Sequence, residues 1–174
     1  MKRGQHDQAS RRLIEAEGYL ELDMAEQALA VLDSTSWDAE FQFPAHFLRG
    51  LVLRDLERHV EAVDALEAAH RARPDDANVL LALGWCLKRA NQLPRAIQAL
   101  ERASQAEPDV ALVHYNLACY HALAGECQTA IDGLKRALEL EPDLRRLVPD
   151  ESDFDPVRND PRFRRLLEGG GSVA

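Results

Sequence analysis

The stretch ANVLLALGWCLKRANQLPRAIQALERASQAEPDV, from Ala77 to Val110, decides the fold of this chain. Before the polar break Ala90-Asn91-Gln92, apolar and small residues share one helical face at positions i, i+3, i+4 and i+7: Leu80, Leu83, Gly84 and Leu87. After the break, a second helical face carries Ala96, Leu100 and Ala103. The stretch therefore predicts a helical hairpin. One hairpin cannot bury both of its faces, so further copies are expected beside it.

The same pattern recurs at a step of 34 residues, the spacing from Gly50 to Gly84, without insertion or deletion. Small residues stand where the paired helices must approach closely: Ala16, Gly50, Gly84 and Ala118, facing Ala28, Ala62, Ala96 and Ala130. A leucine follows one turn later at each repeat: Leu32, Leu66, Leu100 and Leu134. The breaks between helices carry Asp23, Glu57, Asn91 and Gly125, of which the last two favour the left-handed backbone that ends a helix.

From Ala9 to Asp143 the chain resembles the tetratricopeptide repeat family, whose period and small-residue, leucine and proline spacing it shares. The resemblance rests on Leu83-Gly84, Leu87, Ala96, Leu100, Ala103 and Pro108, and on Leu117-Ala118, His121, Ala130, Leu134, Ala137 and Pro142. It implies an all-α, right-handed solenoid of helical hairpins over residues 9–142, with four repeats near 9–42, 43–76, 77–110 and 111–144. The family's early tryptophan is missing, and its site holds Arg12, His46, Leu80 and His114.

The predicted helices follow from the repeat register and its stop signals. They run near 9–21, 24–34, 44–55, 59–72, 77–90, 94–105, 111–124 and 127–140. Thr35 and Ser36 end the second helix early, so we expect a longer loop there, with Trp37 packed onto the first hairpin. Asp75-Asp76, Asp109 and Asp143 are expected to cap the next helices with their carboxylates. Residues 1–8 are predicted to be a flexible N-terminus.

Residues 143–168 lose the repeat period and are predicted to form a short helical cap over the fourth repeat, as a solenoid end requires. The expected apolar anchors are Leu144, Leu147, Phe154, Val157, Phe163, Leu166 and Leu167. This segment is similar to endings that follow repeat arrays in bacterial members of the family, which indicates a bacterial source. Its arginines either pair with the neighbouring acidic residues or mark an acidic partner, and self-pairing is the favoured interpretation. Residues 169–174 are predicted to be a flexible tail.

Composition excludes several functional classes. The 174 residues carry 21 Lys and Arg against 30 Asp and Glu, a formal net charge of −9, so the chain lacks the clustered cations of a nucleic-acid-binding protein. Hydrophobic residues make up 46% and aromatic residues 6%, which suits helices built from Ala and Leu. No apolar run reaches the length of a membrane span, so we expect no membrane insertion and a cytoplasmic location.

The cysteines and histidines do not predict a metal, cofactor or redox site. Cys86, Cys119 and Cys127 have no paired spacing, and Cys86 lies beside the helix-crossing Gly84, so a buried reduced thiol is expected. His114 and His121 share one helical face, and His46 occupies the site of His114 two repeats earlier. Because a zinc site needs three or four convergent ligands, packing or a hydrogen bond is the favoured role for these histidines.

A second apolar row remains on the first helix of each repeat after the core positions are assigned. In the register it comprises Leu13, Phe47, Leu81 and Tyr115, with Leu51, Trp85 and Cys119 one turn later. In the tetratricopeptide repeat family this face is the concave groove, and Arg54, Lys88 and Arg89 are expected at its border. Two alternatives stay open: the row packs against the neighbouring repeat, or the segment after Ser152 folds back and fills the groove.

The predicted function is that of a non-catalytic adaptor or scaffold which binds a short, largely apolar peptide or helix of another protein in this groove. A phosphate-binding glycine loop, a nucleophile elbow and a convergent carboxylate pair are all absent from the sequence, so we expect no enzyme activity. One alternative is a chaperone for apolar export substrates. Another is a scaffold that self-assembles into a homo-oligomer.

Overall fold

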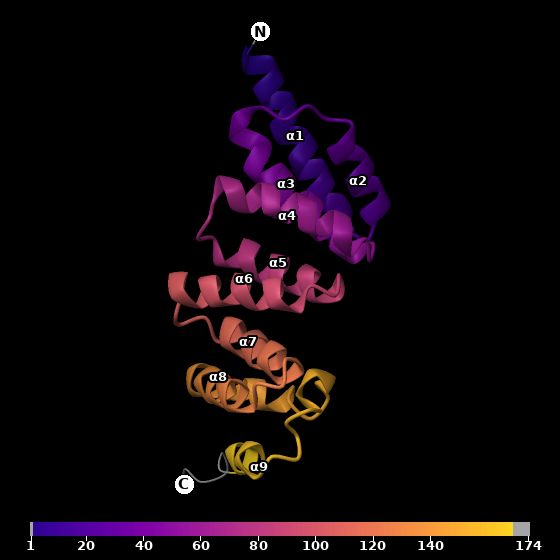
Figure 1. Ribbon diagram of the computed structural model, residues 1–174. Helices are drawn as coiled ribbons and strands as arrows, with labels where there is room; N and C mark the ends of the chain where they lie inside the picture. Colours follow the sequence, from indigo (N-terminus) through magenta and orange to yellow (C-terminus); the bar gives the residue numbers. More distant parts are fainter. Residues whose placement is uncertain (1, 169–174) are drawn as a thin grey trace. The chain divides into compact units, whose positions relative to one another are not determined.

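The computed structural model describes residues 2–168, and all regular secondary structure within them is helical (Figure 1). The predicted fold class, an all-α array of helical hairpins, is confirmed. The chain divides into two compact units, Met1–Gln92 and Leu93–Ala174. The division falls between the two helices of the third predicted repeat, so the repeat limits themselves stay a prediction. No helix within residues 2–168 is both long and apolar enough to span a membrane.

The first unit contains two hairpins and one further helix. Its elements are α1 (Lys2–Glu21), α2 (Ala25–Asp33), α3 (Ala39–Asp55), α4 (His59–Ala72) and α5 (Ala77–Arg89). α1 packs against α2, α3 packs against α4, and α5 packs against α4 and α3. The predicted close approach of paired helices is present at Gly50, where an added Cβ would lie 2.5 Å from the Cγ of Leu66. A larger residue at position 50 would therefore separate α3 from α4.

The second unit contains one helix, one hairpin and the C-terminal segment. Its elements are α6 (Leu93–Ala106), α7 (Ala111–Leu123), α8 (Cys127–Leu140), the 3₁₀ helices η1 (Pro142–Arg146) and η2 (Ser152–Phe154), and α9 (Pro161–Glu168). α7 packs against α8 and α6. In the C-terminal segment η1 and α9 contact α8, whereas η2 contacts α7. The segment therefore touches both helices of the last hairpin.

The four breaks between paired helices share one backbone conformation. Asp23, Glu57, Asn91 and Gly125 have φ angles of 57°, 57°, 59° and 79°, all left-handed. In each break the next N–H group bonds a carbonyl five residues earlier, as Arg58 N does to Leu53 O at 2.9 Å. This is the hydrogen bond of a Schellman helix end. The predicted left-handed stop is thus confirmed at Asn91 and Gly125, and the acidic residues at the other two breaks adopt it as well.

The first helix is longer than the sequence analysis predicts. Residues 1–8 are predicted to be a flexible N-terminus, with helix from Ala9, but α1 begins at Lys2. Lysine, arginine and glutamine are good helix formers, and no proline interrupts this stretch. The side chain of His6 also contacts α3, with its ring centroid 5.1 Å from that of Phe41 and its Nδ1 3.3 Å from the carboxylate of Glu40. These contacts tie the added turns of helix to α3.

α3 also begins earlier than predicted, at Ala39, and Pro44 lies inside it. A proline near a helix start removes at most one backbone hydrogen bond, because the first N–H groups have no partner within the helix. The expected long loop is therefore short. Trp37, within this loop, donates from its indole nitrogen to the carbonyl oxygen of Leu32 at 3.1 Å, which confirms the predicted contact with the first hairpin.

Helix capping by aspartate is confirmed at Asp76 and wrong at Asp109 and Asp143, the last of which lies inside η1 and pairs with Arg146 at 3.1 Å. Asp76 accepts from the backbone N–H groups of Asn78 and Val79, both at 3.1 Å, and caps α5 as predicted. Asp109 does not cap α7, whose N-cap is Val110. The carboxylate of Asp109 instead pairs with Arg136 at 2.9 Å, so a nearby guanidinium group competes successfully with the free helix N–H groups.

The C-terminal segment packs through apolar residues, as predicted. Leu144, Phe154, Val157 and Phe163 are buried, and so is Val148, which the sequence analysis did not single out. Leu147 is 52% exposed and is not an anchor. Residues 169–174, the predicted flexible tail, lie outside the described residues.

The arginines of the C-terminal segment are engaged within their own unit. Arg145 donates to the carbonyl oxygens of Leu166 and Leu167 at 2.8 and 2.6 Å, which closes the end of α9. Arg162 bonds both oxygens of Asp160, and these bonds lower the pKa of that carboxyl group to about 2. The favoured interpretation, that these arginines pair with neighbouring acidic residues, is thus confirmed at Arg162, whereas Arg145 bonds backbone carbonyl oxygens instead.

Candidate functional site

The predicted groove residues of the first unit lie on α1, α3 and α5, and they remain partly accessible. Leu13, Phe47, Leu51 and Leu81 are half-buried, and Trp85 is 36% exposed. By contrast, the core residues on these helices, such as Ala16 and Val52, are fully buried. The row is therefore separate from the core of its hairpins.

Two matching rows define what we call the α3/α5 face: Phe43, Phe47 and Leu51 on α3, and Leu81, Trp85 and Arg89 on α5. Within each row the residues are four apart, so they share one side of their helix. The rings of Phe43 and Phe47 stack, with centroids 6.2 Å apart and planes at 10°. Phe43 was not among the predicted groove residues, although it lies one helical turn before Phe47 in the sequence.

Two guanidinium groups lie over aromatic rings of this face. The Cζ of Arg73, in the connection between α4 and α5, is 3.8 Å from the ring centroid of Phe43. The Cζ of Arg89 is 5.6 Å from the ring centroid of Trp85. Both distances lie in the range of cation–π interactions. Among residues 6–168, whose side chains are described, neither arginine has a carboxylate within ion-pair distance.

The other predicted border cations differ from Arg89. Arg54 pairs with Asp55, its Nε 2.9 Å from the carboxylate, so part of its charge is already balanced. Lys88 is half-buried on α5. Arg73 was not predicted at this face, because it lies in a connection outside the helical register.

Trp85 is partly packed against neighbouring side chains and partly exposed. The ring of His59, at the start of α4, meets it edge-on, with centroids 5.3 Å apart and planes at 80°. The Nδ1 atom of His59 is buried and has no hydrogen-bond partner among the described residues. The open alternative that this row packs against the neighbouring repeat therefore holds in part for Trp85, most of which is buried, while 36% of the residue remains accessible.

Tyr115 and Cys119, the predicted groove residues of α7, are covered by the chain itself. They are 4% and 2% exposed. The ring of Phe154 in η2 meets Tyr115 edge-on at 5.6 Å between centroids. Burial, and then the charges of Cys119, Glu151 and Asp153, raise the pKa of Tyr115. An open groove at these two positions is therefore a wrong expectation, and the alternative that the segment after Ser152 folds back is correct on α7.

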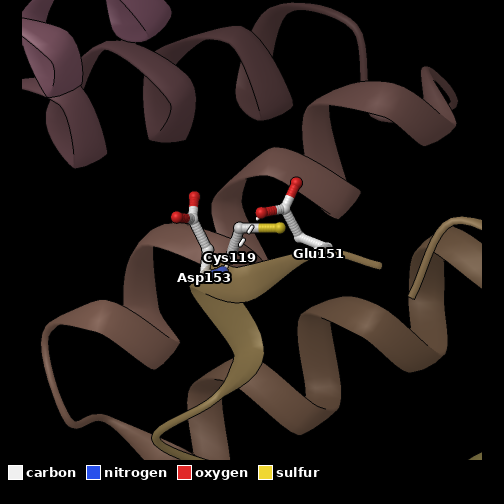
Figure 2. Close-up of side chains that lie close together, drawn as sticks. All are labelled: Cys119, Glu151 and Asp153. Carbon is white, nitrogen blue, oxygen red and sulfur yellow. Dashed lines mark hydrogen bonds between the residues drawn. The ribbon is translucent and has the colours of Figure 1, made fainter. Parts of the chain in front are cut away.

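The C-terminal segment also brings the carboxylates of Glu151 and Asp153 close to Cys119 (Figure 2). The Sγ of Cys119 and carboxylate oxygens of Glu151 and Asp153 all lie within 4.8 Å of one another. Thiolate and carboxylate groups can bind metals, but closed structural zinc sites have four protein ligands, so we assign no ion to these three groups. This cluster was not predictable from the repeat register, because Glu151 and Asp153 lie outside it.

The histidines and the buried cysteine have structural roles, as the favoured interpretation predicts. The Nε2 of His114 lies 2.8 Å from the carbonyl oxygen of Pro108, and the Nδ1 of His121 lies 2.7 Å from the carboxylate of Glu126. Burial, and then the charges of Arg71 and Arg49, lower the pKa of His46. Cys86 is fully buried, and this burial raises its pKa to about 11. Such a thiol stays protonated near neutral pH.

Comparison with known proteins agrees with the helical-hairpin register and the left-handed breaks. Residues 53–118 match the tetratricopeptide repeat family model. Over these residues the chain has the sequence pattern of tetratricopeptide repeats. No curated protein matches its sequence.

Solved structures of other proteins share the fold of this chain. A crystal structure of MamA matches with a TM-score of 0.76 at 16% identity, over 95% of this chain and 96% of that one. A fragment of MamA from Desulfovibrio magneticus matches with a TM-score of 0.72 at 24% identity, over 78% and 76%. YrrB, described as having an unusual peptide-binding site, matches with a TM-score of 0.71 at 20% identity, over 91% and 82%. At these identities the likeness concerns the fold.

Proposed function

We propose that this chain is a non-catalytic scaffold that binds a segment of another protein on the α3/α5 face. The observation that carries the proposal is the 36% exposure of Trp85, at the end of a row that also contains the accessible Phe47, Leu51 and Leu81. Accessible aromatic residues grouped on one face are typical of binding hot spots. The proposed surface lies wholly within the first unit.

The chemistry of the face favours binding over catalysis. Its apolar side chains are rings and leucines, and its uncompensated charges are the guanidinium groups of Arg73 and Arg89. A guanidinium group binds anions but stays protonated throughout the physiological pH range, so it cannot act as a general base. Binding of a protein segment would bury these rings, and each fully buried large apolar side chain contributes about 1.5–3 kcal/mol.

Affinity purification with matched variants tests the proposal. Tagged wild-type chain is compared with Trp85→Ala and with Leu22→Ala, which removes an apolar side chain that is 69% exposed and lies off the α3/α5 face. A partner is accepted only if its binding is reproduced with purified proteins. We expect wild type and Leu22→Ala to bind it equally and Trp85→Ala to lose it. Equal binding by all three chains would contradict the proposed surface.

Light scattering on the same three chains separates the alternatives. A homo-oligomer that dissociates in Trp85→Ala would identify the occupant of the face as a second copy of the chain. Binding of many unfolded proteins, without one preferred sequence, would identify an export chaperone. The scaffold proposal predicts a defined partner and an assembly state that the Trp85→Ala substitution leaves unchanged.

A further inference from the structure

We infer that the α3/α5 face binds an acidic segment with an aromatic residue at its centre, of the kind that residues 151–155 place on α7. This inference rests on the proposed function and specifies the chemistry of the partner. Its basis is that the chain already covers one copy of the repeated row with a segment of its own.

The covered copy of the row is on α7. Tyr115 and Cys119 lie 34 residues after Leu81 and Trp85, so they hold the corresponding positions of the next repeat. Phe154, which is fully buried, packs edge-on against Tyr115 at 5.6 Å between ring centroids. The carboxylates of Glu151 and Asp153 lie beside Cys119 (Figure 2). On α7, the row is therefore covered by an aromatic ring, Phe154, that is preceded by two acidic residues.

The charges of the α3/α5 face suit the same kind of occupant. Several other arginines of the chain have carboxylate partners, for example Arg58 with Glu61 at 2.6 Å and Arg136 with Asp109 at 2.9 Å. Arg73 and Arg89 instead lie over Phe43 and Trp85 and are exposed. Their N–H groups are free to bind carboxylates in a bidentate manner. An uncharged helix would leave these N–H groups without protein acceptors, and a basic segment would be repelled.

The spacing of the two arginines sets the length of the occupant. Phe43 lies 34 residues before Ala77, so the repeat register places it level with the start of α5. Arg73 lies over the ring of Phe43 and is therefore placed at the same level. Arg89 lies twelve residues further along α5, which is about 18 Å at 1.5 Å per residue. An extended segment spans about 18 Å in five or six residues. The occupant thus needs acidic residues near both of its ends and an apolar ring between them.

The neighbouring helix α1 limits the site on one side. Its row carries Leu13, but Glu17 and Glu21 stand on α1 where the corresponding positions on α5 are Trp85 and Arg89. Both glutamates are exposed, so they would repel an acidic segment that extended over α1. The inferred site is therefore confined to α3 and α5.

A synthetic peptide with the sequence of residues 149–158, PDESDFDPVR, is the probe. Its binding to the full chain is followed by fluorescence anisotropy of an attached dye. Wild type and Leu22→Ala are expected to bind it equally, and Trp85→Ala to bind it at least about tenfold more weakly. Arg89→Glu should weaken binding too, and the weakening should shrink as salt is added. Circular dichroism checks that each variant is folded, and if Trp85→Ala is not, the exposed Arg89→Glu decides.

Two altered peptides test the chemistry of the ligand. One replaces the phenylalanine by alanine, and the other replaces all aspartates and the glutamate by their amides. Each is expected to bind wild type at least about tenfold more weakly than the parent peptide. If the amide peptide binds as well as the parent peptide, acidic recognition is wrong. If the alanine peptide does so, aromatic recognition is wrong.

A Phe154→Ala chain separates the two copies of the row. If circular dichroism shows that this destabilised chain is still folded, its α7 row should be accessible, and the chain is expected to bind a second peptide in addition to the one on the α3/α5 face. Peptide binding to Phe154→Ala but not to wild type would overturn the inference. If no chain binds the peptide while a purified protein partner still depends on Trp85, the inference fails and the proposed function stands. If no partner depends on Trp85 either, both fail.

Discussion

Replacing Phe154 by alanine should destabilise the second unit strongly. Phe154 is fully buried and contacts the rings of Tyr115 and Phe163, with centroids 5.6 and 5.4 Å away. Truncating a buried phenylalanine to alanine typically costs about 3–5 kcal/mol, and each aromatic pair adds about 0.5–1.5 kcal/mol beyond the buried area. Both ring contacts disappear in the variant. We therefore expect a loss of about 4 kcal/mol or more in the free energy of unfolding.

Urea denaturation followed by circular dichroism measures the loss, and hydrogen exchange with mass spectrometry locates it. Amides of α7, α8 and α9 should lose protection in Phe154→Ala. The control is Leu147→Ala, in the same segment, because Leu147 is 52% exposed and its truncation should change stability by less than about 0.5 kcal/mol. If both variants change stability equally little, Phe154 does not anchor the C-terminal segment and its assignment as the occupant of α7 is refuted.

Three further outcomes follow from the fold. A chain ending at Asp143 should melt at a lower temperature and associate in light scattering, because the apolar surfaces of α7 and α8 lose their cover. Iodoacetamide labelling near pH 8, read by mass spectrometry, should modify the half-buried Cys127 well before Cys86, whose pKa is raised to about 11 by burial. Glu57→Gly should raise the free energy of unfolding by up to about 1 kcal/mol, because Glu57 has a left-handed φ of 57° that glycine adopts without strain. Gly125→Ala should lower the free energy of unfolding, because it places a side chain at a left-handed φ of 79°.

The hairpins were predictable because their signal repeats. α4 and α8 have the predicted limits, His59–Ala72 and Cys127–Leu140, since a fixed period, a left-handed break and a following proline locate both ends. The starts of α1 and α3 were not predictable from the period. They depend on contacts between residues outside the register, such as His6 with Phe41.

The candidate site was predictable only where the repeats themselves form it. The register predicts Phe47, Leu81 and Trp85 on one face, and each of the three residues is partly exposed. It could not show that Phe154 covers Tyr115, because a segment without a period gives no indication of which helix it contacts. Arg73 was missed for the same reason, since its connection between α4 and α5 lies outside both helical faces.

The most direct test of the central claim is the fluorescence of Trp85 during peptide binding. Trp37 and Trp85 are the two tryptophans of the chain, so Trp37→Phe leaves Trp85 as the sole indole reporter. Trp85 is 36% exposed, and an occupant of the α3/α5 face would bury it further. Titration with PDESDFDPVR should shift its emission to shorter wavelength, with the same midpoint as the anisotropy of the labelled peptide. Saturable peptide binding that leaves the Trp85 emission unchanged would show that the α3/α5 face is not the binding surface.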